Sequence, residues 1–122
     1  MKMKFNDNLP IYIQIMNYLK SKIVTGELKP NDKLPSVREL SSTIKVNPNT
    51  IQRTYSELER EGVTYTQRGM GTFVTEDKDL IYNLKKNMAE EIVNDFIKNM
   101  KNLGFSMEEV TRIISESTKN LS

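Results

Sequence analysis

The stretch "VNPNTIQRTY", residues 46–55, opens like a helix. Asn47 suits the N-cap position, because its side-chain oxygen can accept a hydrogen bond from a backbone N–H of the first turn. Pro48 suits the first helical position, where a missing N–H removes no helical hydrogen bond. The next glycine along the chain is Gly62. The sequence therefore predicts a helix over residues 48–61 that ends at Gly62.

The two sides of this predicted helix differ in chemistry. Ile51, Tyr55 and Leu58 recur at helical spacing and are expected to face inward. The opposite side carries Asn49, Gln52, Arg53, Ser56 and Arg60. Asn and Gln can pair two-fold with adenine, and Arg with guanine, in the DNA major groove. This side favours groove reading, with a merely solvated polar face as the alternative.

Two further helices are predicted before it. The first lies between Pro10 and Gly26, with one apolar stripe. The second opens at Ser36, where Glu39 three residues later completes a capping-box pattern. Only residues 45–46 separate the second helix from the Asn47 cap, so the second and third helices must meet at a sharp angle.

After Gly62 the hydrophobic period changes to alternation. Residues 63–67 and 72–75 alternate, and "RGMG" between them supplies two glycines for a turn. A short strand is also expected near Leu34. The order of elements predicts a mainly α fold with a small β-hairpin, a winged helix-turn-helix. Arg68 at the hairpin tip suits a minor groove, with an ordinary turn as the alternative.

The pattern of the remainder of the chain predicts two helices. We expect a winged helix-turn-helix domain over residues 1–76 and a two-helix tail over residues 77–122. So short a tail cannot bury its apolar stripes alone, so we expect a second copy to cover them; folding back onto the same chain is the alternative. The expected dimer interface comprises Leu84, Met88, Ile92, Phe96, Met100, Val110, Ile113 and Ile114.

Composition excludes several classes of function. The 122 residues contain no cysteine and no histidine, so disulfides, common zinc sites and histidine acid–base chemistry are unavailable. No apolar run suggests export or membrane insertion, so a cytoplasmic protein is expected. Residues 1–75 hold 11 basic and 7 acidic side chains, whereas residues 76–122 hold 7 and 9. The basic first part is compatible with a polyanionic partner.

Residues 10–74 closely resemble the DNA-binding domain of the GntR family of bacterial transcription regulators. The resemblance rests on "GELKPNDKLPSVREL", "VNPNT", "ELEREG" and "RGMGTFV", which occur in order. The short tail resembles the YtrA subfamily by length and pattern, and implies dimerisation through that tail. Two positions depart from the family. Lys45 stands where glycine is usual, which predicts a positive φ there, and Met70 replaces a frequent basic residue of the wing.

The resemblance implies DNA contacts from the second helix, the third helix and the wing. The residues it implies are Arg38, Asn49, Thr50, Arg53, Arg68 and Gly69, with phosphate contacts from Ser36 and Tyr55; Gln52 joins them through its suitability for base edges. The leading hypothesis is a homodimeric, sequence-specific regulator, a repressor, bound to an inverted-repeat operator.

Two other classes of function remain alternatives. A winged helix can also serve as a protein-interaction module without specific DNA binding. An enzyme is the least favoured class, since neither paired carboxylates nor a phosphate loop is present. No cofactor or metal is expected. The operator sequence, the regulated genes and an unidentified small-molecule effector are not determined by the sequence.

Overall fold

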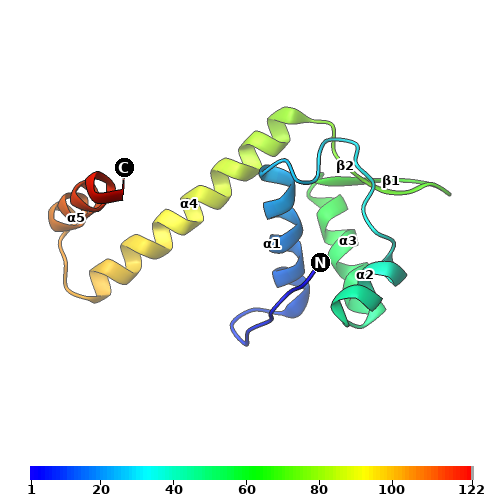
Figure 1. The fold of residues 1–122 in the computed structure, drawn as a ribbon, viewed down its shortest axis with the longest axis horizontal. Helices are drawn as coiled ribbons and strands as arrows, with labels where there is room; N and C mark the ends of the chain where they lie inside the picture. Colours follow the sequence, from blue (N-terminus) through cyan, green and yellow to red (C-terminus); the bar gives the residue numbers. More distant parts are fainter. Residues whose placement is uncertain (122) are drawn as a thin grey trace. The chain divides into compact units, whose positions relative to one another are not determined.

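The computed structural model describes residues 1–121, whose fold is mainly helical with one small hairpin (Figure 1). This confirms the predicted winged helix-turn-helix followed by C-terminal helices. The elements in chain order are α1 (Ile11–Val24), α2 (Val37–Ile44), α3 (Pro48–Arg60), β1 (Thr64–Gln67), β2 (Gly71–Val74), α4 (Lys78–Asn102) and α5 (Met107–Leu121).

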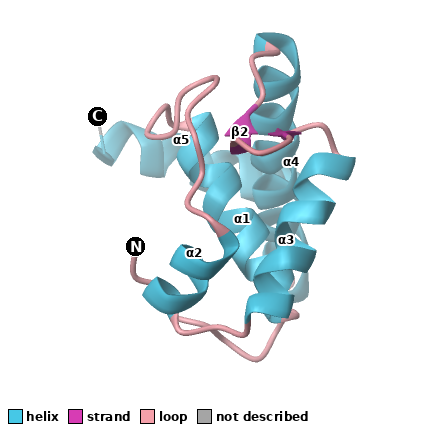
Figure 2. Ribbon diagram, turned by 90° about the vertical axis from the view of Figure 1, so that its right-hand side faces the viewer, coloured by secondary structure: helices cyan, strands magenta, loops and turns pink. Residues whose placement is uncertain are grey.

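The core of the winged helix lies between α1, α2 and α3, which Figure 2 shows grouped together. Ile15 and Leu19 of α1 meet Leu40 of α2 and Ile51 and Leu58 of α3 in one buried cluster. Each such side chain contributes about 1.5–3 kcal/mol when it leaves water. The inward stripe predicted for the third helix is therefore the side that the fold buries.

Both helices of the helix-turn-helix begin with the predicted caps. The Asn47 side chain accepts a hydrogen bond from the Asn49 N–H at 2.8 Å. Ser36 Oγ accepts from the Glu39 N–H at 3.0 Å, and Glu39 Oε1 accepts from the Ser36 N–H at 3.1 Å. The second bond is the main reason why the pKa of Glu39 lies below its ordinary value. These caps fix where α2 and α3 start.

The turn between α2 and α3 has the predicted positive φ. Lys45 adopts φ 57° and ψ 53°, and its N–H donates to the Ser41 carbonyl. The Val46 N–H donates to the same carbonyl at 3.2 Å, and Ser41 Oγ donates to the Val46 carbonyl at 2.5 Å. A residue other than glycine is strained in the left-handed conformation. These hydrogen bonds compensate for part of that cost.

The wing is an antiparallel pair, with Thr64 opposite Val74 and Gln67 opposite Gly71. The Tyr65 and Phe73 rings stack across it, with centroids 5.6 Å apart. The strand predicted near Leu34 is an isolated bridge one residue earlier, between Lys33 and Phe73. Buried Leu34 anchors this segment, so the loop before α2 pairs with the wing.

The chain divides into two compact units, the first spanning Met1–Leu84 and the second starting at Lys85. The predicted boundary between residues 76 and 77 is earlier. Leu80, Ile81 and Leu84 of α4 pack against the core of the first unit, which is why this unit extends into the helix. Leu84, expected at a dimer interface, thus contacts the core of its own chain.

In the second unit, Ser106 and Glu109 form the capping box predicted for the last helix, with bonds of 3.0 and 3.2 Å. Val110 is only 1% exposed in a single chain. Val110 is thus covered within its own unit, and its expected place in a dimer interface stays a prediction. Ile92 is 70% exposed and Phe96 38%.

Replacing Lys45 by glycine should stabilise the domain. The left-handed conformation costs about 1–2 kcal/mol for an L-residue, whereas the added freedom of the unfolded chain costs about 0.4–1 kcal/mol. Lys45→Gly should thus raise the free energy of unfolding by about 0.5–1 kcal/mol in urea titrations. The control Ser42→Gly lies within α2 and should lower it by about 0.5 kcal/mol. Equal destabilisation by both variants would contradict the strain assigned to Lys45.

Candidate nucleic-acid interface

The start of α3 presents the predicted reading residues. Asn49, Gln52 and Arg53 are exposed and Thr50 is half-buried. Gln52 Nε2 donates to Ser56 Oγ at 3.3 Å, one turn further along the same side. The first two turns of α3 therefore hold amide, hydroxyl and guanidinium groups at the surface of the domain.

A hollow of about 380 Å³ joins this surface to the start of α1, and Ile11, Tyr12, Asn49, Thr50 and Arg53 line it. The Arg53 guanidinium carbon lies 3.8 Å from the centroid of the Tyr12 ring. Such a cation–π contact attracts the guanidinium to the ring face. The sequence analysis did not single out Tyr12, since no local pattern shows which residues of α1 and α3 meet.

The start of α2 contributes Ser36 and Arg38. Arg38 is exposed in the first turn of α2. Ser36 is also exposed, and its oxygen already accepts the Glu39 N–H. Since a hydroxyl both accepts and donates, Ser36 keeps its O–H for an acceptor such as a phosphate oxygen.

Tyr55 does not share this surface. Its side chain is 5% exposed, and its hydroxyl donates to the Pro35 carbonyl at 2.6 Å. Burial, together with the negative charge of Glu39, raises the pKa of the Tyr55 hydroxyl. In this structure the Tyr55 hydroxyl fastens α3 to the segment before α2, and its expected phosphate contact stays a prediction.

The wing tip contains Arg68, Gly69 and Met70, all exposed. Gly69 has φ 79°, and no atom lies within 4 Å of the position that a Cβ would take. Glycine is thus needed there for its backbone conformation rather than for space. Met70 is 60% exposed and uncharged, so Arg68 is the charged side chain of the tip itself.

Arginines of this surface form no ion pair within the described residues. Across residues 1–121 the ion pairs are Lys20–Glu61, Lys22–Glu27 and Arg60–Glu57. None of these pairs includes Arg38, Arg53 or Arg68. Their positive charge is therefore available to an anionic partner, while the pairs that do form lie elsewhere.

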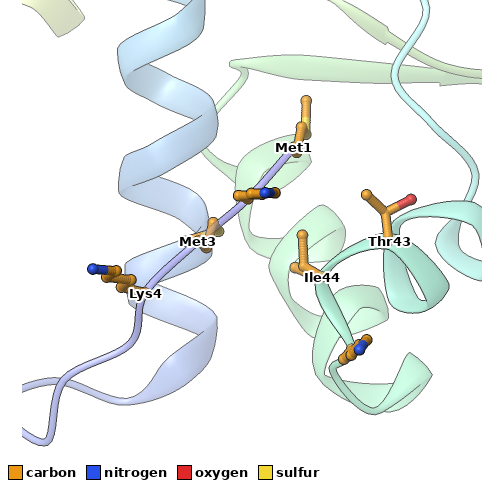
Figure 3. A pocket seen from close by; sticks show the side chains of 7 residues that line it. Met1, Met3, Lys4, Thr43 and Ile44 are labelled. Carbon is orange, nitrogen blue, oxygen red and sulfur yellow. The ribbon is translucent and has the colours of Figure 1, made fainter.

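A second hollow, of about 520 Å³, separates the N-terminal segment from the end of α2 (Figure 3). Met3 and Phe5 hold this segment against the core. The hollow is lined by Met1, Lys2, Met3, Lys4, Thr43, Ile44 and Lys45. Three lysines therefore add positive charge close to the turn of the helix-turn-helix.

Fold and surface together define the class of winged helix-turn-helix DNA-binding regulators. The family described as bacterial regulatory proteins, gntR family, matches residues 11–74, and the chain belongs to it. Among the described residues, no helix is long and apolar enough to cross a membrane.

Curated relatives agree with this assignment over nearly the whole chain. The uncharacterized HTH-type transcriptional regulator YhcF of Bacillus subtilis is 47% identical over 95% of this chain and 96% of its own length. The HTH-type transcriptional repressor YtrA of the same organism is 42% identical over 88% of this chain and 83% of its own length. The predicted likeness to the YtrA subfamily is confirmed, and these relatives are regulators rather than enzymes.

Solved structures share the fold. A GntR family transcriptional regulator from Listeria monocytogenes is 44% identical and superimposes with a TM-score of 0.83, covering 92% of this chain and 98% of that one. The DNA-binding domain of AraR in complex with operator ORX1 is 30% identical with a TM-score of 0.56, covering 62% of this chain and 95% of that one. The protein is a GntR-family transcription regulator, and regulators of this family bind DNA operators.

Tyr55→Phe tests whether the Tyr55 hydroxyl serves the fold rather than DNA. Removing it leaves the half-buried Pro35 carbonyl without its donor, which should lower the free energy of unfolding by about 1–2 kcal/mol. DNA affinity, measured well below the unfolding temperature, should stay unchanged. Unaltered stability with weakened DNA binding would instead place the hydroxyl on a phosphate.

Proposed function

We propose that this protein is a homodimeric repressor that reads an inverted-repeat operator with the start of α3 in the major groove. The observation that carries the proposal is the exposed polar start of α3, where Arg53 lies over the Tyr12 ring without a carboxylate partner. The repressor role is supported by the name of YtrA, and operator binding by the AraR complex.

Arg53 is the proposed guanine reader. A guanidinium that rests its face on an aromatic ring keeps the N–H groups at its edge free. These groups match the O6 and N7 acceptors of guanine, and Asn49 and Gln52 match adenine in the same groove. The Tyr12 ring restricts the orientations open to Arg53, so less conformational entropy is lost when the base pair forms.

The other exposed residues are proposed to position the domain. Arg38 and Ser36 at the start of α2 suit phosphate oxygens, and Thr50 suits a phosphate or a base edge. Arg68 and Gly69 at the wing tip suit the adjacent minor groove, where negative potential attracts arginine. Such contacts set affinity and orientation, whereas base contacts set sequence preference.

An interaction module without DNA specificity would need apolar anchors on the exposed side of α3. The large apolar side chains of α3, namely Ile51, Tyr55 and Leu58, are all buried. This composition favours a polar, hydrogen-bonding partner such as a DNA groove. Because that partner is the chromosome, the proposed location is the cytoplasm.

The tail supports the proposed dimer. Large apolar side chains in it are exposed in a single chain, and a second copy would remove them from water. Ile92 and Phe96 are proposed at the centre of this contact, with Met88, Met100, Ile113 and Ile114 around them.

A two-fold dimer presents two α3 helices in opposite directions, which is why the operator should be an inverted repeat. Half-site centres about 10 base pairs apart, or a multiple of this, place both helices on the same face of DNA. An insertion of about five base pairs would turn one half-site away. Footprinting of genomic fragments that the purified protein retains gives this spacing directly.

Arg53→Ala should weaken binding to the recovered operator by about 1–3 kcal/mol and abolish the preference at one base pair in each half-site. The matched control is Arg60→Ala, which removes an exposed arginine already paired with Glu57 on the same helix. The control should retain the preference at every position. Competition assays with single-base operator variants provide the measurement. An unchanged preference in Arg53→Ala would refute the reading role of α3.

Ile92→Asp should give monomers in sedimentation experiments, because a charge would lie in the apolar contact. On an operator with two half-sites, the affinity of this variant should fall to that of a single half-site. The wild type should show the same fall when the insertion of about five base pairs separates the half-sites. The control Asn94→Asp adds the same charge on the opposite side of α4 and should remain dimeric. A dimeric Ile92→Asp variant would exclude Ile92 from the interface.

A further inference from the structure

The outer side of β2 pairs with a segment that sequence analysis did not assign to DNA. The Leu34 N–H donates to the Thr72 carbonyl at 2.8 Å, and the Val74 N–H donates to the Asp32 carbonyl at 2.9 Å. Lys33 lies between these bonds and faces Phe73 in an antiparallel bridge. The segment before α2 therefore runs along β2 and pairs with it through this isolated bridge.

The Lys33 side chain extends from this segment across Gly71. A Cβ built on Gly71 would lie 2.7 Å from Lys33 Cε, 3.7 Å from Cδ and 3.6 Å from Nζ. In an antiparallel sheet the residue two positions from the direct partner is the diagonal neighbour, and Gly71 has that place relative to Phe73. The missing side chain of Gly71 is thus the space that the end of the lysine occupies.

This placement brings the Lys33 ammonium to the end of β2 that adjoins the wing tip. Gly71 pairs with Gln67, and residues 68–70 form the turn between them. Arg68 is in that turn and is the charged residue of the tip. Lys33 therefore adds a second positive charge at the base of the tip.

The Lys33 ammonium forms no ion pair with the part of the chain that the structure describes. None of the ion pairs within residues 1–121 includes Lys33. Its charge does reach α2, because it is a minor contributor to the lowered pKa of Glu39, behind the hydrogen bonds from Ser36. Lys33 therefore lies between the first turn of α2, where Arg38 is exposed, and the wing that bears Arg68.

We propose that Lys33 is a further DNA contact, which binds a backbone phosphate between the site of α2 and the site of the wing and is aimed there by Gly71. The inference rests on the proposed function. An ammonium is a compact charge that binds a phosphate without reading a base. The bridge to Phe73 and the space above Gly71 restrict the lysine stem before DNA arrives, which lowers the entropy lost on binding.

Lys33→Met tests this contact, since methionine keeps the apolar stem and removes the charge. The probe is a mixed-sequence 30-base-pair duplex, because a phosphate contact does not depend on sequence. Binding of the full chain is measured from 0.05 to 0.3 M KCl. Loss of one contact should lower the salt slope by about 0.9, which corresponds to about eightfold weaker binding at 0.1 M. Lys33→Arg should retain the wild-type slope.

The matched control is Lys29→Met, which removes an equal charge from the same loop, at an exposed position. It should leave the salt slope at the wild-type value, and thermal unfolding should confirm that each variant is folded. A wild-type slope in Lys33→Met, or an equal loss in Lys29→Met, overturns the inference and leaves the proposed function intact. Failure of the wild type to bind any duplex overturns both.

Discussion

Burial of the inward side of α3 against α1 and α2 is the constraint on which the rest of the molecule depends. Ile51 and Leu58 are fully enclosed, and the Tyr55 hydroxyl is bonded to the Pro35 carbonyl. A helix buried on one side must present its other side to the surroundings. The same packing that stabilises the domain therefore determines that Arg53 and its polar neighbours face outward.

The caps and the turn convert this packing into a defined orientation. Asn47 and Ser36 fix the first residues of α3 and α2, and strained Lys45 lets the two helices meet within two residues. Because α3 is held against α1, Arg53 comes to rest on the Tyr12 ring. Cations that form no ion pair within the described residues lie on this packed frame. Such cations suit a polyanionic partner, because little reorganisation is needed to bind it.

The wing and the tail extend this frame in different ways. Pairing of the loop before α2 with β2 couples the wing to the helix-turn-helix, so Lys33 and Arg68 keep a defined relation to Arg38. The exposed apolar side chains of the tail, such as Ile92, have no comparable partner in the single chain. They support the proposed association with a second copy, which would place two reading helices on one operator.

The sequence by itself determined the helices, their caps, the hairpin and the positive φ of Lys45, because each depends on residues close together in the chain. It also assigned the chain to its family and to DNA-binding regulation. Only the tertiary structure decided that Val110 is buried within its own unit, that the Tyr55 hydroxyl meets the Pro35 carbonyl, that Tyr12 lies under Arg53 and that Lys33 crosses Gly71. These outcomes depend on which distant segments pack together, and no local period encodes that choice.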